Sequence, residues 1–469
     1  MRGILAASLT RRMSETALNE CLDKMRREGL ADAAVETFRH YFEQLEAGET
    51  GMLPESDLEP VDELPAFDEL PETDAADLLD QAVVIKLNGG LGTSMGMTGP
   101  KSLLEVKDGR TFLDVIAEQV LEQRRRAGAR LPLVLMNSFA TREPSLDALG
   151  RHGDLEADVP ADFVQNKEPK ITVEDHRPVE WPEDPSLEWC PPGHGDLYTA
   201  LQTSGMLERL LDQGYRYAFV SNVDNLGAVL EPRILAWFAE SGAPFAMEVA
   251  DRTAADRKGG HIARRRSDGG LVLRETAQTP DEDSDAFQDI ERHRFFNTNN
   301  LWLDLQALAD VLAEREGVLG LPMIVNRKTV DPSDKSSPPV IQIVTAMGSA
   351  IGVVEGAAAL RVPRARLAPV KATSDLLVLR SDAYELTPEH HVVLVEQRDG
   401  RAPLVDLDDD HFKLLRDFDE RFPHGAPSLV ACDELTVQGD VTFGRDVVVR
   451  GTVTVEGPRE VADGEVLEG

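Results

Sequence analysis

Strand-like apolar runs alternate with helical patterns from Val83 to about Leu379. The runs read "AVVIKL", "LPLVLMNS", "YAFVSNVDN", "PFAMEVA" and "DLLVLR", and amphipathic segments such as "TFLDVIAEQVLEQRRRAG" and "DLYTALQTSGMLERLLDQG" lie between them. This alternation predicts an α/β domain built on a largely parallel, doubly wound sheet. Such sheets bind ligands beyond the carboxyl ends of their strands, so we expect functional residues where these runs end.

The first 80 residues are expected to form a helical segment and an acidic connector. Apolar residues recur at helical spacing from Leu18 to Met25 and again from Val35 to Leu45. The following "ETGMLPESDLEPVDELPAFDELPETDAAD" is acidic and interrupted by prolines. We predict that this stretch is too polar for a core element and lies on the surface.

Near the C-terminus, in "LTVQGDVTFGRDVVVRGTVTVEG", apolar residues recur every six positions. Two rows share this spacing: Leu435, Val441, Val447 and Val453, and Val437, Phe443, Val449 and Val455. Such a hexad favours a parallel β-helix over the alternative, an antiparallel meander. So few hexads bury little surface, so this part should dock on a neighbour or support a homo-oligomer. We predict domains at 1–80, 81–380 and 381–469.

Composition excludes several classes of partner. The chain carries 84 acidic and 49 basic residues, a formal net charge of −35, which argues against nucleic acid or an anionic membrane as a partner. No stretch approaches the roughly 18 apolar residues of a transmembrane helix. Three distant cysteines suit a reducing, cytoplasmic location. A signal peptide is disfavoured because the apolar part of "MRGILAASLTRRM" is short, and Met13 is an alternative start.

A glycine-rich loop follows the strand-like run that begins at Val83. In "VVIKLNGGLGTSMGMTGPKS" Met95 replaces the last glycine of a dinucleotide fingerprint, and Pro100 separates Gly99 from Lys101 where a Walker loop needs them adjacent. Glycines still let backbone N–H groups approach an anion. We therefore predict a phosphate or base cradle of another class, with Lys101 reaching the phosphates.

Two later segments add recognition groups. Gln165, in "FVQNKEPK", has an amide that matches the donor and acceptor edge of a pyrimidine. In "CPPGHGDLYTALQ", Asp196 is expected to be the N-cap of the next helix, whose N-terminus suits an anion. His194 is interpreted as a hydrogen-bonding residue, since no second histidine lies at metal-ligand spacing.

Asp224 ends the run "RYAFVSNVDN", where a carboxylate can hold Mg²⁺ together with substrate phosphates, although a turn-forming role is the alternative. The asparagines of "FFNTNNLWLDL" suit sugar hydroxyls or turns. Lys371, in "APVKATSDLLVL", is expected in a loop before a strand.

Six segments, in this order, resemble the eukaryotic-type UTP–glucose-1-phosphate uridylyltransferase (UDP-glucose pyrophosphorylase) family. They are "KLNGGLGTSMGMTGPKS", "FVQNKEPK", "PPGHGDLY", "NVDNLG", "FNTNNLW" and "VKATSDLL". The resemblance covers nearly the whole chain after about residue 80. It implies a Rossmann-like nucleotidyltransferase domain followed by a left-handed β-helix, UTP and glucose 1-phosphate as substrates, and Mg²⁺ as cofactor.

The resemblance also implies residue roles. Nucleotide contacts would come from Leu87, Asn88, Gly89, Gly90, Gln165 and Gly193, and sugar-phosphate contacts from His194, Asn222, Val223 and Asn299. Lys101 and Asp224 would lie at the phosphates and the magnesium, and Lys371 would be the principal catalytic lysine. Gly260 and Glu275 are weaker candidates at the sugar. The arginine run at 264 and the acidic connector have no match in the family.

Two alternatives remain at this level. A related enzyme could use an N-acetylhexosamine phosphate, and the chain could be a non-catalytic sugar-nucleotide-binding protein. The latter predicts loss of Lys101, Asp224 or Lys371, and all three are present.

Overall fold

The computed structural model describes residues 2–73 and 75–469, with side chains from residue 14 onward. The chain forms two compact units, and it enters each of them three times. Unit 1 comprises Met1–Thr73, Phe163–Val220 and Arg233–Val362, and unit 2 comprises Asp74–Asp162, Ser221–Pro232 and Pro363–Gly469. In the part of the chain that is described, no helix is both long and apolar enough to cross a membrane.

Unit 1 is built around the long buried strand β14 (Phe295–Asp304), which pairs antiparallel with β10 (Tyr217–Asn222) and β11 (Phe245–Asp251). β11 pairs parallel with β17 (Ala358–Arg361), and β12 (His261–Arg265) pairs antiparallel with β13 (Leu271–Arg274). A separate antiparallel sheet contains β15 (Met323–Thr329), β16 (Pro339–Thr345) and β8 (Ile171–Thr172). The remaining elements of this unit are α6 (Leu197–Thr203), α7 (Met206–Asp212), α8 (Pro232–Ser241), α9 (Ser284–Gln288), α10 (Leu305–Glu314), β7 (Glu168–Pro169) and β9 (Trp189–Cys190).

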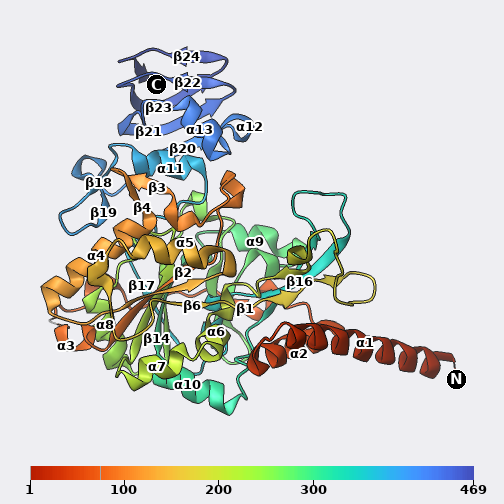
Figure 1. The fold of residues 1–469 in the computed structure, drawn as a ribbon. Coiled ribbons are helices and arrows are strands. Elements are labelled where there is room, and N and C mark those ends of the chain that lie inside the picture. The colour runs from red at the N-terminus through yellow and green to blue at the C-terminus, as the bar shows by residue number, and fades with distance from the viewer. Residues whose placement is uncertain (1, 74) are drawn as a thin grey trace. The chain divides into compact units, whose positions relative to one another are not determined.

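The N-terminal helices of unit 1 pack against that separate sheet. α1 (Arg2–Arg27) and α2 (Asp32–Glu46) are the consecutive red helices of Figure 1, and they contact each other. The predicted apolar stripe is buried, with Cys21, Leu22 and Phe42 fully inaccessible in one cluster that also contains Ile341 and Ile343 of β16. Burial of this stripe is what holds the helices on the sheet.

Unit 2 contains the parallel pair β2 (Ala82–Asn88) and β5 (Leu133–Asn137), with α4 (Phe112–Ala127) between them in sequence. α4 begins with a capping box between Thr111 and Asp114 and ends at Gly128 in the left-handed conformation, so local sequence fixes both ends. The remaining elements of the α/β part are α3 (Ala76–Leu79), α5 (Phe139–Leu149), β3 (Glu105–Lys107), β4 (Arg110–Thr111) and β6 (Asp162–Val164).

The C-terminal part of unit 2 contains a stack of short parallel strands, drawn in blue in Figure 1. Leu435 lies opposite Val453 and Val441 opposite Arg459, so each pair is offset by 18 residues, which is three hexads. All eight residues of the two predicted rows are buried. The elements are β18 (Tyr384–Leu386), β19 (Val392–Leu394), β20 (Leu404–Leu407), α12 (Asp409–Phe412), α13 (Leu415–Arg421), β21 (Ser428–Gln438), β22 (Val441–Phe443), β23 (Val448–Glu456), β24 (Arg459–Val461) and β25 (Val466–Glu468).

Several local predictions need correction. The run "DLLVLR" is not a strand but part of α11 (Thr373–Arg380), because the Asp375 carboxylate accepts the backbone N–H groups of Lys371 and Ala372 and so starts a helix. The segment after Asp196 forms two helices, α6 and α7, which are separated at Gly205 in the left-handed conformation. The sequence predicted a largely parallel sheet, but β14 pairs antiparallel with β10 and β11. The alternation of strands and helices along the chain does not determine the direction in which a strand runs.

The acidic connector is not entirely a surface segment. Its residues Leu58–Glu59 form β1, which pairs antiparallel with β12, and Leu58 is fully buried. The average composition of the connector is polar, so it did not predict that single apolar residues within it are buried. Val61 and Leu70 are buried in the same way.

Candidate functional site

In unit 2 the glycine loop leaves β2 beside the segment that carries Asp224. The carbonyl of Leu87 accepts a hydrogen bond from the N–H of Val223 at 3.2 Å. The Asn88 side chain is buried and donates to Asn137 and Ser145, both at 2.7 Å. The amide nitrogen of Asn88 is therefore held in the core, while its Oδ1 has no hydrogen-bond partner among the described residues.

Lys101 and Asp224 form the central ion pair of this site. Lys101 Nζ lies 2.7 Å from Asp224 Oδ2, and both side chains are largely but not fully buried. The N–H of Lys101 also donates to the carbonyl of Gly90 at 3.0 Å, which closes the loop. A lysine and a carboxylate 123 residues apart are thus placed together at the end of the glycine loop.

The segment before Lys371 is joined to the Asp224 turn by the backbone. The N–H of Val370 donates to the carbonyl of Asp224 at 3.1 Å, and Asn225 forms a bridge with Pro369. Lys371 itself is exposed. Its backbone N–H donates to the Asp375 carboxylate at 2.7 Å, which fixes the main chain and leaves the ammonium group at the surface.

A buried lysine that the sequence analysis missed lies beneath this turn. Lys86 is 1% exposed, and its Nζ donates to Ser221 Oγ and to the carbonyl of Ala228, both at 2.7 Å. These bonds hold the start and the end of the segment that contains Asn222, Val223 and Asp224. A single lysine inside the apolar run "AVVIKL" was the available signal.

Unit 1 holds the other sequence-predicted residues. Gln165 directly follows β6, and the next residue, Asn166, donates from its backbone and side chain to the Asp196 carboxylate. Gly193 has φ +82°, and a Cβ there would lie 2.5 Å from the Thr345 carbonyl oxygen, so only glycine fits. His194 Nδ1 accepts the N–H of Met347 at 3.1 Å, which requires Nδ1 to be unprotonated.

Asn299 lies in a β-bulge of β14. The register with β11 shifts between Glu248 and Val249, and Asn299 adopts a left-handed φ of +58°. Its N–H and its Oδ1 both bond the Asn297 side chain, at 2.9 and 3.0 Å. Bulges commonly redirect a side chain near functional sites, and this one displaces Asn299 from the regular ladder.

Gly260 and Asn297 meet on the same part of unit 1. The N–H of Asn297 donates to the Gly260 carbonyl at 2.9 Å. A Cβ on Gly260 would contact the Glu275 carboxylate at 2.6 Å, so this glycine makes room for that side chain. The structure therefore brings together the two weaker sugar candidates and the asparagine that holds Asn299.

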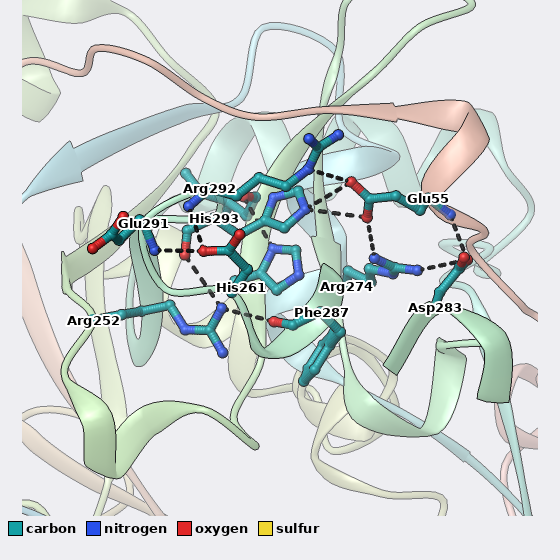
Figure 2. Close-up of polar contacts among 11 residues, drawn as sticks. Glu55, Arg252, His261, Arg274, Asp283, Phe287, Glu291, Arg292 and His293 are labelled. Atoms are coloured by element: carbon teal, nitrogen blue, oxygen red, sulfur yellow. Dashed lines mark hydrogen bonds and ion pairs between the residues drawn. The ribbon is translucent and has the colours of Figure 1, made fainter. Parts of the chain in front are cut away.

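Several chain neighbours of these residues form a charged cluster with Glu55, which Figure 2 shows. Glu55, from the acidic connector, lies 2.6 Å from Arg274, 2.7 Å from Arg292 and 3.1 Å from His293. The His293 ring stacks on His261 with centroids 4.1 Å apart. Burial, and then the neighbouring His293, lower the pKa of His261 well below its usual value, so His261 is neutral. This Glu55 cluster fixes the connector to β12 and β13.

The described carboxylates limit what kind of magnesium site the chain can form. Among residues 2–73 and 75–469, no group of three or more His, Cys, Asp or Glu side chains is arranged to hold a metal. Mg²⁺ needs only one or two protein carboxylates when phosphates supply other oxygens. Asp224, partly accessible beside the glycine loop, fits a site of that kind.

Comparison with known proteins gives consistent matches over most of the chain. The family model described as UTP–glucose-1-phosphate uridylyltransferase matches residues 35–450. The UTP–glucose-1-phosphate uridylyltransferase of Hordeum vulgare is 41% identical over 396 residues, which cover 83% of this chain and 81% of the barley protein. The Saccharomyces cerevisiae protein of the same name is 40% identical over 396 residues, 83% of this chain and 77% of its own.

A solved structure agrees with this chain in fold. It is a crystal structure of a UDP-glucose pyrophosphorylase variant from Leishmania major in complex with UDP-glucose. It superposes with a TM-score of 0.91 at 46% identity, covering 96% of this chain and 98% of the Leishmania chain.

Proposed function

This chain belongs to the UTP–glucose-1-phosphate uridylyltransferase family, and we propose roles in its reaction for the residues of each unit. The enzyme transfers the uridylyl group of UTP to glucose 1-phosphate and releases pyrophosphate, giving UDP-glucose. The observation that supports the assignment of roles is the meeting of the glycine loop, Lys101, Asp224 and the Lys371 segment in one compact unit.

The residues of unit 2 handle the phosphates. Backbone groups of Leu87, Asn88, Gly89 and Gly90 hold the nucleotide, as the burial of the Asn88 amide away from the loop suggests. Asn222 and Val223 contact the sugar phosphate. Lys101 and Lys371 place positive charge at the transferred group, despite the chain's net charge of −35.

The residues of unit 1 handle the base and the sugar. Gln165 and Gly193 contact the uracil, while His194 and Asn299 contact the sugar phosphate. A neutral His194, whose Nδ1 already accepts from Met347, has its other ring nitrogen as an N–H donor. That donor suits a phosphate or hydroxyl oxygen.

The chemical step is an in-line displacement at the α-phosphorus of UTP. A phosphate oxygen of glucose 1-phosphate attacks, the bond to the β-phosphate oxygen breaks, and pyrophosphate leaves with that electron pair. The attacking phosphate is already ionised, so no protein nucleophile is needed. The protein therefore acts by positioning two anions and stabilising the charge that builds up between them. Mg²⁺ held by Asp224 would neutralise part of the charge on the phosphate oxygens.

The C-terminal strands form a left-handed β-helix that supports a homo-oligomer. The 18-residue offset between paired strands and the exposure of Val466 on the last strand support this proposal. Sedimentation of the chain with and without residues 430–469 tests it. The cytoplasm is the proposed location, because Cys21, Cys190 and Cys432 are separate buried thiols, as in a reducing compartment.

One assay tests the substrate assignment. UTP release from UDP-glucose in the presence of pyrophosphate is compared with release from UDP-N-acetylglucosamine. We expect rapid turnover of UDP-glucose and much slower turnover of the N-acetylated sugar. Comparable rates would refute the glucose assignment, and no turnover with either would refute the enzyme assignment.

A further inference from the structure

Asp196 is the N-cap residue of α6, as the sequence predicts, but its side chain makes no capping hydrogen bond because the carboxylate is used elsewhere. Oδ2 accepts the backbone N–H of Asn166 at 2.6 Å, and Oδ1 accepts the Asn166 side-chain amide at 2.9 Å. Asn166 directly follows Gln165, and Asp196 lies two residues after His194. One carboxylate therefore joins the two segments of unit 1 to which the uridine nucleotide is assigned.

Both segments are held from other sides as well. The N–H of Thr345, at the end of β16, donates to the Pro192 carbonyl at 2.9 Å, and the Thr203 hydroxyl donates to the Asn166 amide oxygen at 3.3 Å. These contacts anchor each segment separately. The Asp196 carboxylate links the Gln165 segment directly to the Gly193 loop.

We propose that ionised Asp196 is a positioning residue for the uridine nucleotide, holding the Gln165–Asn166 backbone in register with the Gly193–His194 loop. This inference rests on the proposed placement of the uracil at Gln165 and Gly193. Asp196 is 4% exposed and does not touch the reacting atoms, so it acts through Gln165 and the loop.

The hydrogen-bond pattern favours the ionised carboxylate. Two N–H groups donate to Asp196, one to each oxygen, and both hydrogen bonds are stronger to the ionised carboxylate than to the neutral acid, whose oxygens are weaker acceptors. Burial raises the pKa of Asp196 to about 7, against the two hydrogen bonds from Asn166, which lower it. The carboxylate therefore gains and loses its proton around neutral pH.

The neighbouring carboxyl group of Glu168, in β7, is protonated when Asp196 is ionised. Glu168 and Asp196 both line a cavity of about 20 Å³. Burial, and then the Asp196 charge, raise the pKa of Glu168 well above its ordinary value, and its Oε1 has no hydrogen-bond partner among the described residues. Since Asp196 accepts two N–H groups whereas Glu168 accepts one, from the backbone of Ile343, the negative charge of the pair resides on Asp196.

The other titratable groups around Asp196 provide no counter-charge in the described structure. Burial raises the pKa of the Tyr41 phenol of α2 and of the Cys190 thiol of β9, so both are neutral. His194 is held unprotonated at Nδ1 by Met347. Two nearby lysines have carboxylate partners: Lys167 is paired with Glu28, and Lys24 with Glu188.

Nucleotide affinity should therefore fall with decreasing pH. If only the ionised form binds, the dissociation constant rises about tenfold for each pH unit below the midpoint. UDP-glucose is the suitable probe, because it has no group that ionises between pH 6 and 8.5. We expect calorimetry to show binding roughly tenfold weaker at pH 6 than at pH 8.

Three substitutions separate positioning from a structural role. Asp196→Asn should bind UDP-glucose roughly 10- to 100-fold more weakly at pH 8, the loss expected for a charge-assisted hydrogen bond, with no pH dependence. Asn166→Ala keeps the backbone donor but removes the side-chain donor, so its midpoint should move to higher pH. Glu168→Gln is the matched control, a neutral isostere in the same cavity, and should leave the midpoint unchanged.

The inference is overturned if the dissociation constant of the parent enzyme is the same at pH 6 and pH 8, or if folded Asp196→Asn binds as the parent does. Thermal unfolding at pH 8 verifies that the variants are folded. If Asp196→Asn does not fold, an unchanged midpoint in Asn166→Ala overturns it. A Gln165→Ala variant with parental affinity would instead refute the placement of the uracil, so the two failures are distinguishable.

Discussion

Replacing Lys371 with alanine should slow turnover without destabilising the protein. Lys371 is exposed, and the hydrogen bond from its backbone N–H to Asp375 survives in alanine. Unfolding free energy should therefore change by less than about 0.5 kcal/mol. The lost charge at the transferred phosphoryl group should cost about 10²–10³ in kcat, as for one oxyanion-hole donor. That factor corresponds to about 3–4 kcal/mol of activation free energy.

The assay follows pyrophosphate release from UTP and glucose 1-phosphate at saturating substrate, with thermal unfolding measured on the same samples. Lys371→Arg retains the charge and should lose less activity than Lys371→Ala. Lys335→Ala, at another exposed lysine, is the matched control and should retain full activity. A fully active Lys371→Ala enzyme would refute the assigned role, and a large drop in its melting temperature would refute the reasoning from exposure.

Four further outcomes are expected. Lys101→Met, which removes the partner of Asp224, should lower kcat by about 10²–10³ in the same assay with folding intact. Asp224→Asn should raise the magnesium concentration needed for half-maximal rate, and an unchanged value would exclude it as a ligand. Gly193→Ala, strained at φ +82° and only 2.5 Å from the Thr345 carbonyl, should lose about 1–3 kcal/mol of stability and raise the KM for UTP. Glu55→Gln should lose about 3 kcal/mol by chemical unfolding at neutral pH. Burial acts to raise the pKa of Glu55, but its contacts with His293, Arg292 and Arg274 lower it below 4.5, so the deficit should persist above that pH and shrink as pH falls through the lowered value.

Local sequence determined the elements that carry their own start and stop signals. The ends of α4 follow from Thr111, Asp114 and Gly128, and the C-terminal hexads predicted all eight buried positions. The short run at 373–380 was ambiguous because an apolar stretch of that length suits a strand or a helix, and Asp375 decides it through a cap.

The candidate site was predictable in its residue types but not in its geometry. The proximity of Lys101 to Asp224, and of Asn166 to Asp196, depends on tertiary structure that no spacing in the sequence encodes. Asp196 was interpreted as a cap because an aspartate before a helix usually is one. That carboxylate instead accepts hydrogen bonds from Asn166, which lies 30 residues earlier in the chain.

If Asn299 contacts the sugar phosphate as proposed, its left-handed backbone limits how this enzyme can evolve a new sugar preference. At φ +58°, asparagine, aspartate and glycine are tolerated, whereas bulkier or β-branched side chains are strained. A new side chain at position 299 must therefore tolerate this positive φ, whatever its chemistry. Natural variation in sugar choice should therefore accumulate at neighbouring positions with ordinary backbone angles, such as Glu275, while position 299 stays nearly fixed.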